Sequence, residues 1–297
     1  MDTTRRAAVL AAFVGDCLAL GPHWIYDQAR IAREFPGLSG PVAPLADSYH
    51  KGKGRGDFTH YGDQMLVLLE SAAAKGGFDA ADFAQRWQAL FADGYAGYVD
   101  GATRRTLENL KAGWPAEEAG STSQDLSGAS RFAPLLGFVT DPEALAGAAR
   151  QQAALTHKSP QVVDAAAFLA RVASRVLGGQ AVRPAVEEAA KQAEVPDIGR
   201  LAEAGLASAG EDSLAVIERF GQNCEFQSAF PSVVHLLARY ADDPAAGLLQ
   251  STLAGGDSAA RNIAVGCVLG AAHGEGAVPA GWLEAMKAAP RIQELLS

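Results

Sequence analysis

The sequence has few cysteines, no excess of basic residues and no long hydrophobic run, and each lack excludes a class of protein. Its three cysteines, Cys17, Cys224 and Cys267, are far apart and odd in number, so they predict neither a disulfide framework nor a CxxC metal site. Each stands among apolar neighbours and is expected to be a small buried residue rather than a nucleophile. The formal net charge of −9 opposes binding to nucleic acid or to an anionic membrane.

No stretch approaches the roughly twenty apolar residues that a membrane span needs. The N-terminal segment MDTTRRAAVLAAFVGD carries two arginines and an apolar run, as a signal peptide does, but Asp16 interrupts the run and no cleavage site follows. We therefore expect a cytoplasmic protein with no membrane or nucleic-acid partner. A small molecule is the expected ligand, and the sequence indicates no oligomeric state.

Strand-like alternation of apolar and polar residues is also missing, whereas alanine and leucine recur at helical spacing along nearly the whole chain. The sequence therefore predicts an all-α fold, and without a linker or a repeat we expect a single domain over 1–297. Two segments, 162–177 and 259–272, are apolar on nearly every side and are predicted to lie at the centre of a multilayer bundle.

Three segments between the expected helices, 36–61, 113–131 and 221–231, are rich in glycine and longer than connection alone requires. Long loops in a compact helical domain often carry function. The unusual polar residues of the chain concentrate at the edges of these loops and at the starts of the expected helices.

One such start is AGGDSAARN at 254–262. Asp257 and Ser258 precede an apolar helix, where either side chain could simply cap free backbone N–H groups. Gly255 and Gly256 favour a functional interpretation, because they allow the backbone to approach a ligand closely. The sequence leaves both interpretations open.

A second helix start, THYGDQ at 59–64, places His60, Tyr61 and Asp63 within a few residues. Asp63 could be only a helix cap, and a lone histidine is often a structural residue. The density of polar groups nevertheless favours a site, and a histidine base is chemically sensible near neutral pH.

A third group follows the first helix. Asp16 lies within an apolar segment and should have a partner, because an unpaired buried acid is costly. His23, Trp24 and Tyr26 follow a Gly-Pro turn. Such a cluster can hold an adenine or a sugar, although it can equally wedge two helices apart.

The fourth group is DLSGASRFAPL at 125–135, in which Gly128 and Ser130 are small residues beside Arg131. Backbone N–H groups next to an arginine suit a phosphate. His157 precedes the apolar helix at 162 and completes the set of candidate ligand-binding residues.

The order of these motifs resembles the ADP-ribosylglycohydrolase family across almost the whole chain: GD late in the first helix, then DQM, GASRFAPL, TH and GGDS. The resemblance implies a multi-helical orthogonal bundle, a cleft that binds ADP-ribose, and typically two Mg²⁺ ions that help cleave an ADP-ribosyl bond. GPHWIYD and THYGDQ are more similar to the branch that contains the J1 crystallins, for which the resemblance implies no particular reaction.

At the first metal-binding segment the family pattern TDDTQM corresponds to HYGDQM here. His60 stands in place of a ligand threonine, and Tyr61 and Gly62 stand in place of two ligand acids. Asp63 replaces the next threonine. A further acid of the family falls at or near His23. We therefore expect catalytic roles for His60, Asp63 and His23 rather than a magnesium pair.

At the second segment the family pattern GGDTDTNA corresponds to GGDSAARN. Asp257 is retained, Ala259 and Ala260 have lost an acid and a hydroxyl, and Arg261 has appeared one helical turn after Asp257. We expect Arg261 to fill part of a vacated metal position and to pair with Asp257, with Asp63 nearby. The resemblance then implies no cofactor or a single Mg²⁺, held by Asp257 and Asp63.

Two classes of function follow. The first is a hydrolase of an ADP-ribosyl or related glycosidic bond, in which His60 or Asp63 activates a water and Gly255, Gly256 and Arg131 contribute to binding. The second is a non-catalytic binding or structural protein, as in the crystallins, whose polar groups satisfy one another. An open pocket with an unsatisfied His60 would favour the enzyme, and a closed network the binder. A standard two-magnesium enzyme is the least favoured.

Overall fold

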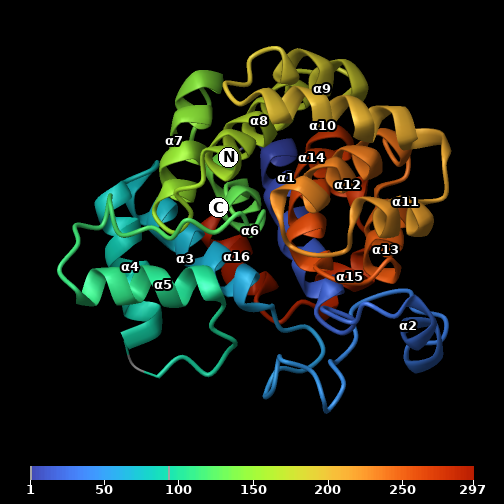
Figure 1. Ribbon diagram of the computed structural model, residues 1–297, viewed down its shortest axis with the longest axis horizontal. Coiled ribbons are helices and arrows are strands. Elements are labelled where there is room, and N and C mark those ends of the chain that lie inside the picture. The colour runs from blue at the N-terminus through green and yellow to red at the C-terminus, as the bar shows by residue number, and fades with distance from the viewer. Residues whose placement is uncertain (1, 93) are drawn as a thin grey trace.

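The computed structural model describes residues 2–92 and 94–297, and these fold into sixteen α-helices and three short 3-10 helices (Figure 1). The α-helices are α1 Thr3–Ala19, α2 Gln28–Glu34, α3 His60–Lys75, α4 Ala80–Ala92, α5 Gly101–Lys111, α6 Ser127–Ser130, α7 Pro142–Ala154, α8 Pro160–Leu177, α9 Val182–Ala190, α10 Pro196–Ala207, α11 Ser213–Phe220, α12 Phe226–Arg239, α13 Pro244–Leu253, α14 Ser258–His273, α15 Ala280–Ala285 and α16 Ala289–Leu295. The 3-10 helices are η1 Ala133–Gly137, η2 Ser208–Gly210 and η3 Gly274–Ala277. The predicted all-α fold is confirmed.

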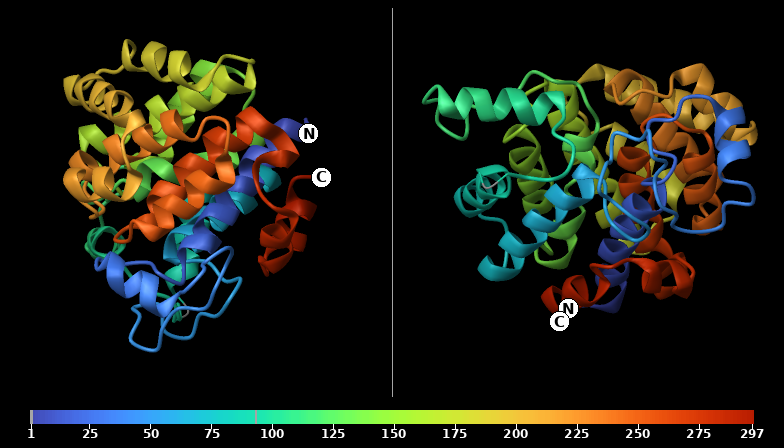
Figure 2. Two further views of the ribbon diagram at one scale, coloured as in Figure 1. Left: turned by 90° about the vertical axis from the view of Figure 1, so that its right-hand side faces the viewer. Right: turned by 90° about the horizontal axis from the view of Figure 1, so that it is seen from below.

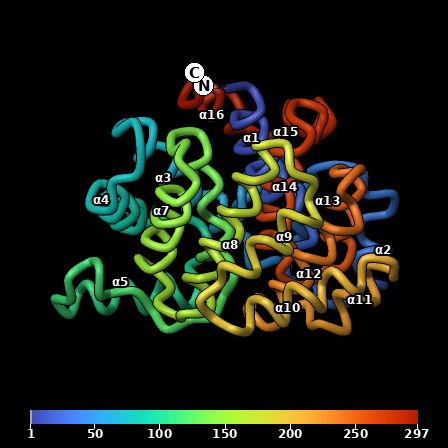
Figure 3. Tube along the Cα trace, turned by 90° about the horizontal axis from the view of Figure 1, so that it is seen from above, coloured from blue at the N-terminus to red at the C-terminus, as the bar shows by residue number. Residues whose placement is uncertain are grey.

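The predicted central helices are α8 and α14. Every residue of α14 from Ser258 to Ala271 is buried, and the helix packs against α1, α8, α12 and α13. Seen from above, α4 and α5 lie on one side of the molecule and α10, α11 and α13 on the other, with α8 between them (Figure 3). The two termini lie close together at one edge (Figures 2 and 3).

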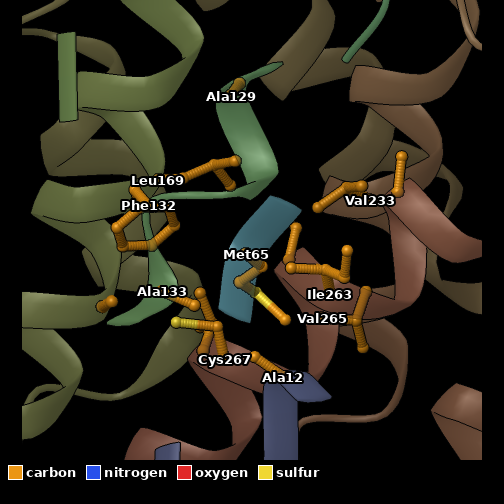
Figure 4. Close-up of a cluster of buried hydrophobic side chains, with 14 of the residues drawn as sticks. Ala12, Met65, Ala129, Phe132, Ala133, Leu169, Val233, Ile263, Val265 and Cys267 are labelled. Atoms are coloured by element: carbon orange, nitrogen blue, oxygen red, sulfur yellow. The ribbon is translucent and has the colours of Figure 1, made fainter. Parts of the chain in front are cut away.

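The apolar core fills the space around α14. Met65 of α3 lies beside Ile263 and Cys267 of α14, with Ala12 of α1 and Leu169 of α8 around them (Figure 4). These side chains are fully or almost fully buried, so Cys267 is the small buried residue that its surroundings predicted. Within the described residues no helix is long and apolar enough to cross a membrane.

One predicted loop is too long. The segment 221–231 was expected to be irregular up to its proline, but α12 begins at Phe226 and holds Pro231 inside it. The carbonyl that loses its helical partner to Pro231 belongs to Gln227, which is exposed to solvent. Water can satisfy that carbonyl, so this proline does not end the helix. The helix start at His60 places His60 and Tyr61 in the first turn of α3.

The close approach of α1 and α14 depends on the absence of a side chain at Gly266. A Cβ atom there would overlap the backbone carbonyl of Ala11. We expect Gly266→Ala to force the two helices apart and to lower the free energy of unfolding by about 1–3 kcal/mol, measured by urea denaturation. Gly147→Ala, inside α7, is the matched control: no described atom lies within 4 Å of its new methyl group. That variant should be neutral or gain up to about 1 kcal/mol of stability from helix propensity. Equal losses in both variants would contradict the packing argument.

Candidate functional site

The candidate site forms where the loop after α1 meets the turn before α14. The Trp24 N–H donates to the Gly256 carbonyl at 2.9 Å, and the Gly256 N–H donates to the Ile25 carbonyl at 2.8 Å. Gly255 and Gly256 both have positive φ, and a Cβ on either would overlap the backbone of Ile25 or Gln222. The close neighbour that requires these glycines is therefore the protein's own backbone rather than a ligand, which corrects the sequence-based interpretation.

Asp16 joins the end of α1 to the start of α3. Its carboxylate accepts hydrogen bonds from the Thr59 backbone N–H at 2.8 Å and from the Thr59 hydroxyl at 2.6 Å. Thr59 is thus the partner that a buried acid needs. Burial raises the pKa of Asp16 to about 6, and the hydrogen bonds from Thr59 oppose this rise. Because the carboxylate is fully enclosed and occupied by Thr59, Asp16 positions α3 and does not face a ligand.

Asp257 occupies the N-cap position of α14 but does not cap it. Within residues 2–92 and 94–297 neither of its carboxylate oxygens has a hydrogen-bond partner, although the residue is completely buried. The nearest basic group is the His23 ring, whose Nε2 lies 3.5 Å from Oδ1 of Asp257. Burial and then the neighbouring Asp125 carboxylate raise the pKa of Asp257 well above its usual range. Asp257 thus makes no side-chain capping hydrogen bond among the described residues, although the Ala260 backbone N–H favours its ionised form and opposes the rise of its pKa.

His60 lies in the first turn of α3 and faces Asp100, the residue that caps α5. Its Nε2 is 3.3 Å from Oδ2 of Asp100. Asp100 also accepts hydrogen bonds from the backbone N–H and hydroxyl of Thr103, at 2.6 and 3.0 Å. Burial alone would raise the pKa of Asp100, but His60 and the Thr103 N–H outweigh it and hold this pKa below its usual range. The arrangement is an oriented imidazole–carboxylate pair.

Aromatic rings surround this pair. The Trp24 ring stacks on His23 and His50, with centroid distances of 4.6 and 5.3 Å, and lies 5.3 Å from His60. Tyr98 packs edge-on against Trp24 at 4.8 Å. Trp24 is also the one non-glycine residue with positive φ among those that the structure describes, a backbone geometry that is typical of functional sites. His23, His60 and Trp24 therefore lie together, and His50 and Tyr98, which no sequence motif indicated, lie beside them.

A small cavity of about 10 Å³, room for about one water molecule, lies next to Asp100. Tyr61, Arg131 and His157 line it together with Gln64 and Ser127. His157 has its Nδ1 bonded to the Thr156 hydroxyl at 2.8 Å, and its ring packs against Gly128. Burial and then the charge of Arg131 lower the pKa of His157 to about 4.

Arg131 uses four of its five N–H groups on protein acceptors. Its guanidinium donates to Gln152, Gln64 and Thr156 at 2.7–3.1 Å. Ser130 in the same segment donates its hydroxyl to the Leu126 carbonyl. Most N–H groups of Arg131 are therefore used to tie α3 to α7, which leaves at most one of them for the phosphate contact that the sequence predicted.

Arg261 does not make the expected pair. Among the described residues no ion pair joins it to Asp257 within 4.0 Å. Its guanidinium instead donates to the carbonyls of Ser251 and Gly255 at the end of α13, at 3.1 and 2.5 Å. The last four carbonyls of a helix lack intrahelical partners. Carbonyls at this helix end therefore accept from Arg261 in place of the Asp257 carboxylate. Arg261 thus caps α13 and acts on Asp257 only through its charge.

Asp63 faces away from Asp257. Its carboxylate pairs with Lys53 at 2.6 Å and accepts a short hydrogen bond from the Tyr95 hydroxyl. It lines a separate groove of about 460 Å³ with Asp57 and Glu70. The structure therefore separates Asp63 from the residues with which it was expected to share a metal or a water. Tyr26, by contrast, is half-exposed near Asp257 and Cys224.

The residues at the family's metal positions do not fit two magnesium ions, each of which needs about six oxygen ligands. Tyr61 turns its hydroxyl to Oδ2 of Asp125 at 3.0 Å. At Gly62 a Cβ atom would overlap Oδ2 of Asp16, so no acid can stand there beside Asp16. Ala259 and Ala260 offer no oxygen ligand from their side chains.

Comparison with known proteins agrees with the helical fold described above. The model of the ADP-ribosylglycohydrolase family matches residues 3–297. The chain belongs to the ADP-ribosylglycohydrolase family. It is 21% identical to Crystallin J1A of Tripedalia cystophora over 301 residues, which cover 94% of this chain and 90% of the crystallin. A solved structure described as an ADP-ribosylglycohydrolase-related protein complex shares its fold, with a TM-score of 0.72 and 24% identity over 99% of this chain and 95% of that one.

Besides Tyr98, sequence reasoning missed four residues of the candidate site. Asp100 carries the signal of a helix cap, an acid directly before a helical pattern, but nothing in the sequence links it to His60. His50 lies deep in the long loop before α3. Asp125 and Cys224 come from two other loops, which meet through an isolated β-bridge between Asp125 and Glu225.

We expect Gly62→Asp, which restores a family acid, to destabilise the protein without creating a magnesium site. The new side chain would overlap the Asp16 carboxylate and bring a second charge against it. Thermal unfolding with and without Mg²⁺ measures this. Gly62→Ala, which adds bulk but no charge, should also lower the melting temperature. Wild-type stability together with Mg²⁺-dependent stabilisation of Gly62→Asp would contradict the steric argument.

Acid stability should depend on His157. The unfolded chain protonates this histidine near its ordinary pKa of 6.5, but the folded protein does so only near 4, so the unfolded state binds more protons between these values. Stability therefore falls as the pH decreases through this window. His157→Asn should lose about 2 kcal/mol less than the wild type between pH 7 and pH 5 in urea unfolding. The exposed His273→Asn is the control, and an equal loss in both variants would argue against a neutral buried His157.

Proposed function

We propose that the chain is a hydrolase that cleaves a glycosidic bond of an ADP-ribosyl or related small molecule, with an imidazole–carboxylate pair as its proton acceptor. One observation carries the proposal. His60 is 1% exposed, its Nε2 lies 3.3 Å from Oδ2 of Asp100, and among the described residues neither of its ring nitrogens has a hydrogen-bond partner. A buried imidazole beside a carboxylate, with a ring nitrogen free to accept a proton, is suited to general base catalysis.

Asp100 determines which nitrogen of His60 can accept a proton. Because Asp100 is ionised and fixed by Thr103, it favours the tautomer of His60 that carries its proton on Nε2 and accepts on Nδ1. A water that gives its proton to Nδ1 attacks the anomeric carbon of the sugar. The bond from that carbon to the leaving group breaks, and the leaving group keeps the electron pair and takes up a proton from solvent, to which the imidazolium later returns its own. Asp100 then stabilises the imidazolium by charge.

Exposed rings near the pair and near Asp257 offer places for the base and sugar of the ligand. Tyr49, which packs edge-on against the partly exposed Trp24, is 63% exposed, and Tyr26 near Asp257 is 51% exposed. Aromatic faces of this kind stack on an adenine ring. They support a nucleotide-like small molecule as the substrate.

The second candidate function is a non-catalytic protein with a binding or structural role. Several polar groups favour it, because Arg131, Arg261 and Asp63 already bind protein partners instead of facing a ligand. Similarity to a crystallin points the same way. The unpartnered nitrogens of His60 and the unpartnered oxygens of Asp257 support the enzyme instead, because a purely structural network would leave fewer such groups buried.

We expect the metal-stripped protein to bind ADP-ribose in calorimetric titration and to release ADP-ribose from an ADP-ribosylated acceptor without added Mg²⁺. His60→Asn should keep the binding and lose hydrolysis by about 10²–10⁴-fold, since a general base contributes that much. The exposed His273→Asn should retain wild-type rates.

The two candidate functions predict different outcomes in this experiment. Binding without turnover, unchanged in His60→Asn, would favour the non-catalytic protein. Binding or turnover that requires Mg²⁺ would contradict the imidazole mechanism and restore a magnesium-dependent one.

A further inference from the structure

We propose that Asp125, Cys224 and Asp257 form a binding site for one thiophilic divalent cation of the Zn²⁺ class, in which Asp125 and Cys224 are ligands that the family's magnesium pattern does not contain. A carboxylate oxygen of each aspartate and the Sγ atom of Cys224 all lie within 4.8 Å of one another. That separation is what three ligands need to converge on a single ion with little movement. The site does not depend on whether the chain hydrolyses a substrate.

Backbone hydrogen bonds hold the three ligands together. The loops that carry Asp125 and Cys224 pair through the Leu126 N–H to the Cys224 carbonyl at 2.9 Å and the Phe226 N–H to the Gln124 carbonyl at 2.8 Å. The Asp257 N–H donates to the Gln222 carbonyl of the same loop at 2.8 Å. All three ligands are thus anchored to one short stretch of backbone, so the site is built before any ion binds.

A buried group without a partner points into this cluster. Asp257 is 0% exposed, and in the part of the chain that the structure describes both its carboxylate oxygens lack hydrogen bonds. Such a carboxylate is costly unless something compensates it. The positive charge of Arg261 opposes the rise that burial causes in the pKa of Asp257. Its N–H groups, however, donate to carbonyls at the end of α13 and not to the Asp257 carboxylate. A cation between Asp257 and Asp125 would give Asp257 a partner and offset the charge of both acids.

The surrounding groups orient the ligands as outer-shell residues do in metal sites. Asp125 accepts from the Tyr61 hydroxyl at 3.0 Å through Oδ2 and from the Ser127 N–H at 2.8 Å through Oδ1. His23 accepts the Ala259 N–H on Nδ1 at 3.4 Å, which places its proton on Nε2, 3.5 Å from Oδ1 of Asp257. His23 therefore faces Asp257 with an N–H group and is not itself a ligand.

The donor set selects the metal. One sulfur and two carboxylate oxygens suit Zn²⁺ or Co²⁺, whereas Mg²⁺ requires an all-oxygen octahedron. Three protein ligands leave a fourth tetrahedral position for water or a ligand oxygen. Cys224 is only partly buried and Tyr26 beside it is half-exposed, so an ion can reach the site from solvent.

Co²⁺ titration of the reduced, metal-stripped, full-length protein tests the proposal. We expect one Co²⁺ per chain, a sulfur-to-cobalt charge-transfer band in the near ultraviolet and the intense visible bands of a four-coordinate ion. Zn²⁺ should displace the Co²⁺ and raise the melting temperature, and a large excess of Mg²⁺ should do neither. Absence of the charge-transfer band, or displacement by Mg²⁺, would overturn the proposal.

Variants separate this site from the other thiols. Cys224→Ser should abolish the charge-transfer band and weaken Zn²⁺ binding at least tenfold, and Asp257→Asn should weaken Co²⁺ binding while the band of the remaining complex keeps its sulfur character. Cys267→Ala removes a core thiol and should leave the band unchanged. A band that survives Cys224→Ser, or Co²⁺ affinity unaffected by Asp257→Asn, would refute the ligand set. Melting curves of the metal-free variants show whether each is folded.

Discussion

The hydrogen bonds between Gly256 and the backbone of Trp24 and Ile25 hold the end of α1 against the start of α14, and the candidate site depends on this junction. They require positive φ at both Gly255 and Gly256, and they place His23 beside Asp257. The same turn supplies the Gly255 carbonyl that Arg261 uses, so the burial of a full positive charge is linked to the same geometry. A shift of the junction by one residue would disturb every one of these contacts.

The polar groups around the junction fall into two electrostatic classes. Asp16, Arg131 and Arg261 are buried and hydrogen-bonded to protein groups, and these bonds link neighbouring segments. His60 and Asp257 are equally buried but unsatisfied among the described residues, which lowers stability relative to an apolar core. Proteins keep such groups where a ligand or a reaction uses them, and the second class is concentrated at the starts of α3 and α14.

The sequence was sufficient for the helical fold and for the two central helices, since these follow from periodicity, and its motifs singled out His23, His60 and Trp24. It was insufficient to predict which groups these polar side chains contact. The helical spacing of Asp257 and Arg261 permits a pair, but it cannot show that the free carbonyls of α13 are nearer. Asp100 and Cys224 lie far from His60 and Asp257 along the chain, and only the packing of α5 and the loop before α12 brings them together.

Where the resemblance places acids of the family, this chain has other side chains, and their packing depends on the absence of those acids. Because Asp16 and Thr59 occupy the space beside Gly62, the acid missing from that position could not return without displacing them. Tyr61 fills the neighbouring position and turns its hydroxyl to Asp125, which thereby faces Cys224 and Asp257 instead of solvent. Tyr61, which stands where the resemblance places a magnesium ligand, thus donates to a carboxylate that lies beside a thiol. The side chains that the structure brings together here are imidazole, thiol and carboxylate groups, which as classes accept protons and bind softer cations than magnesium.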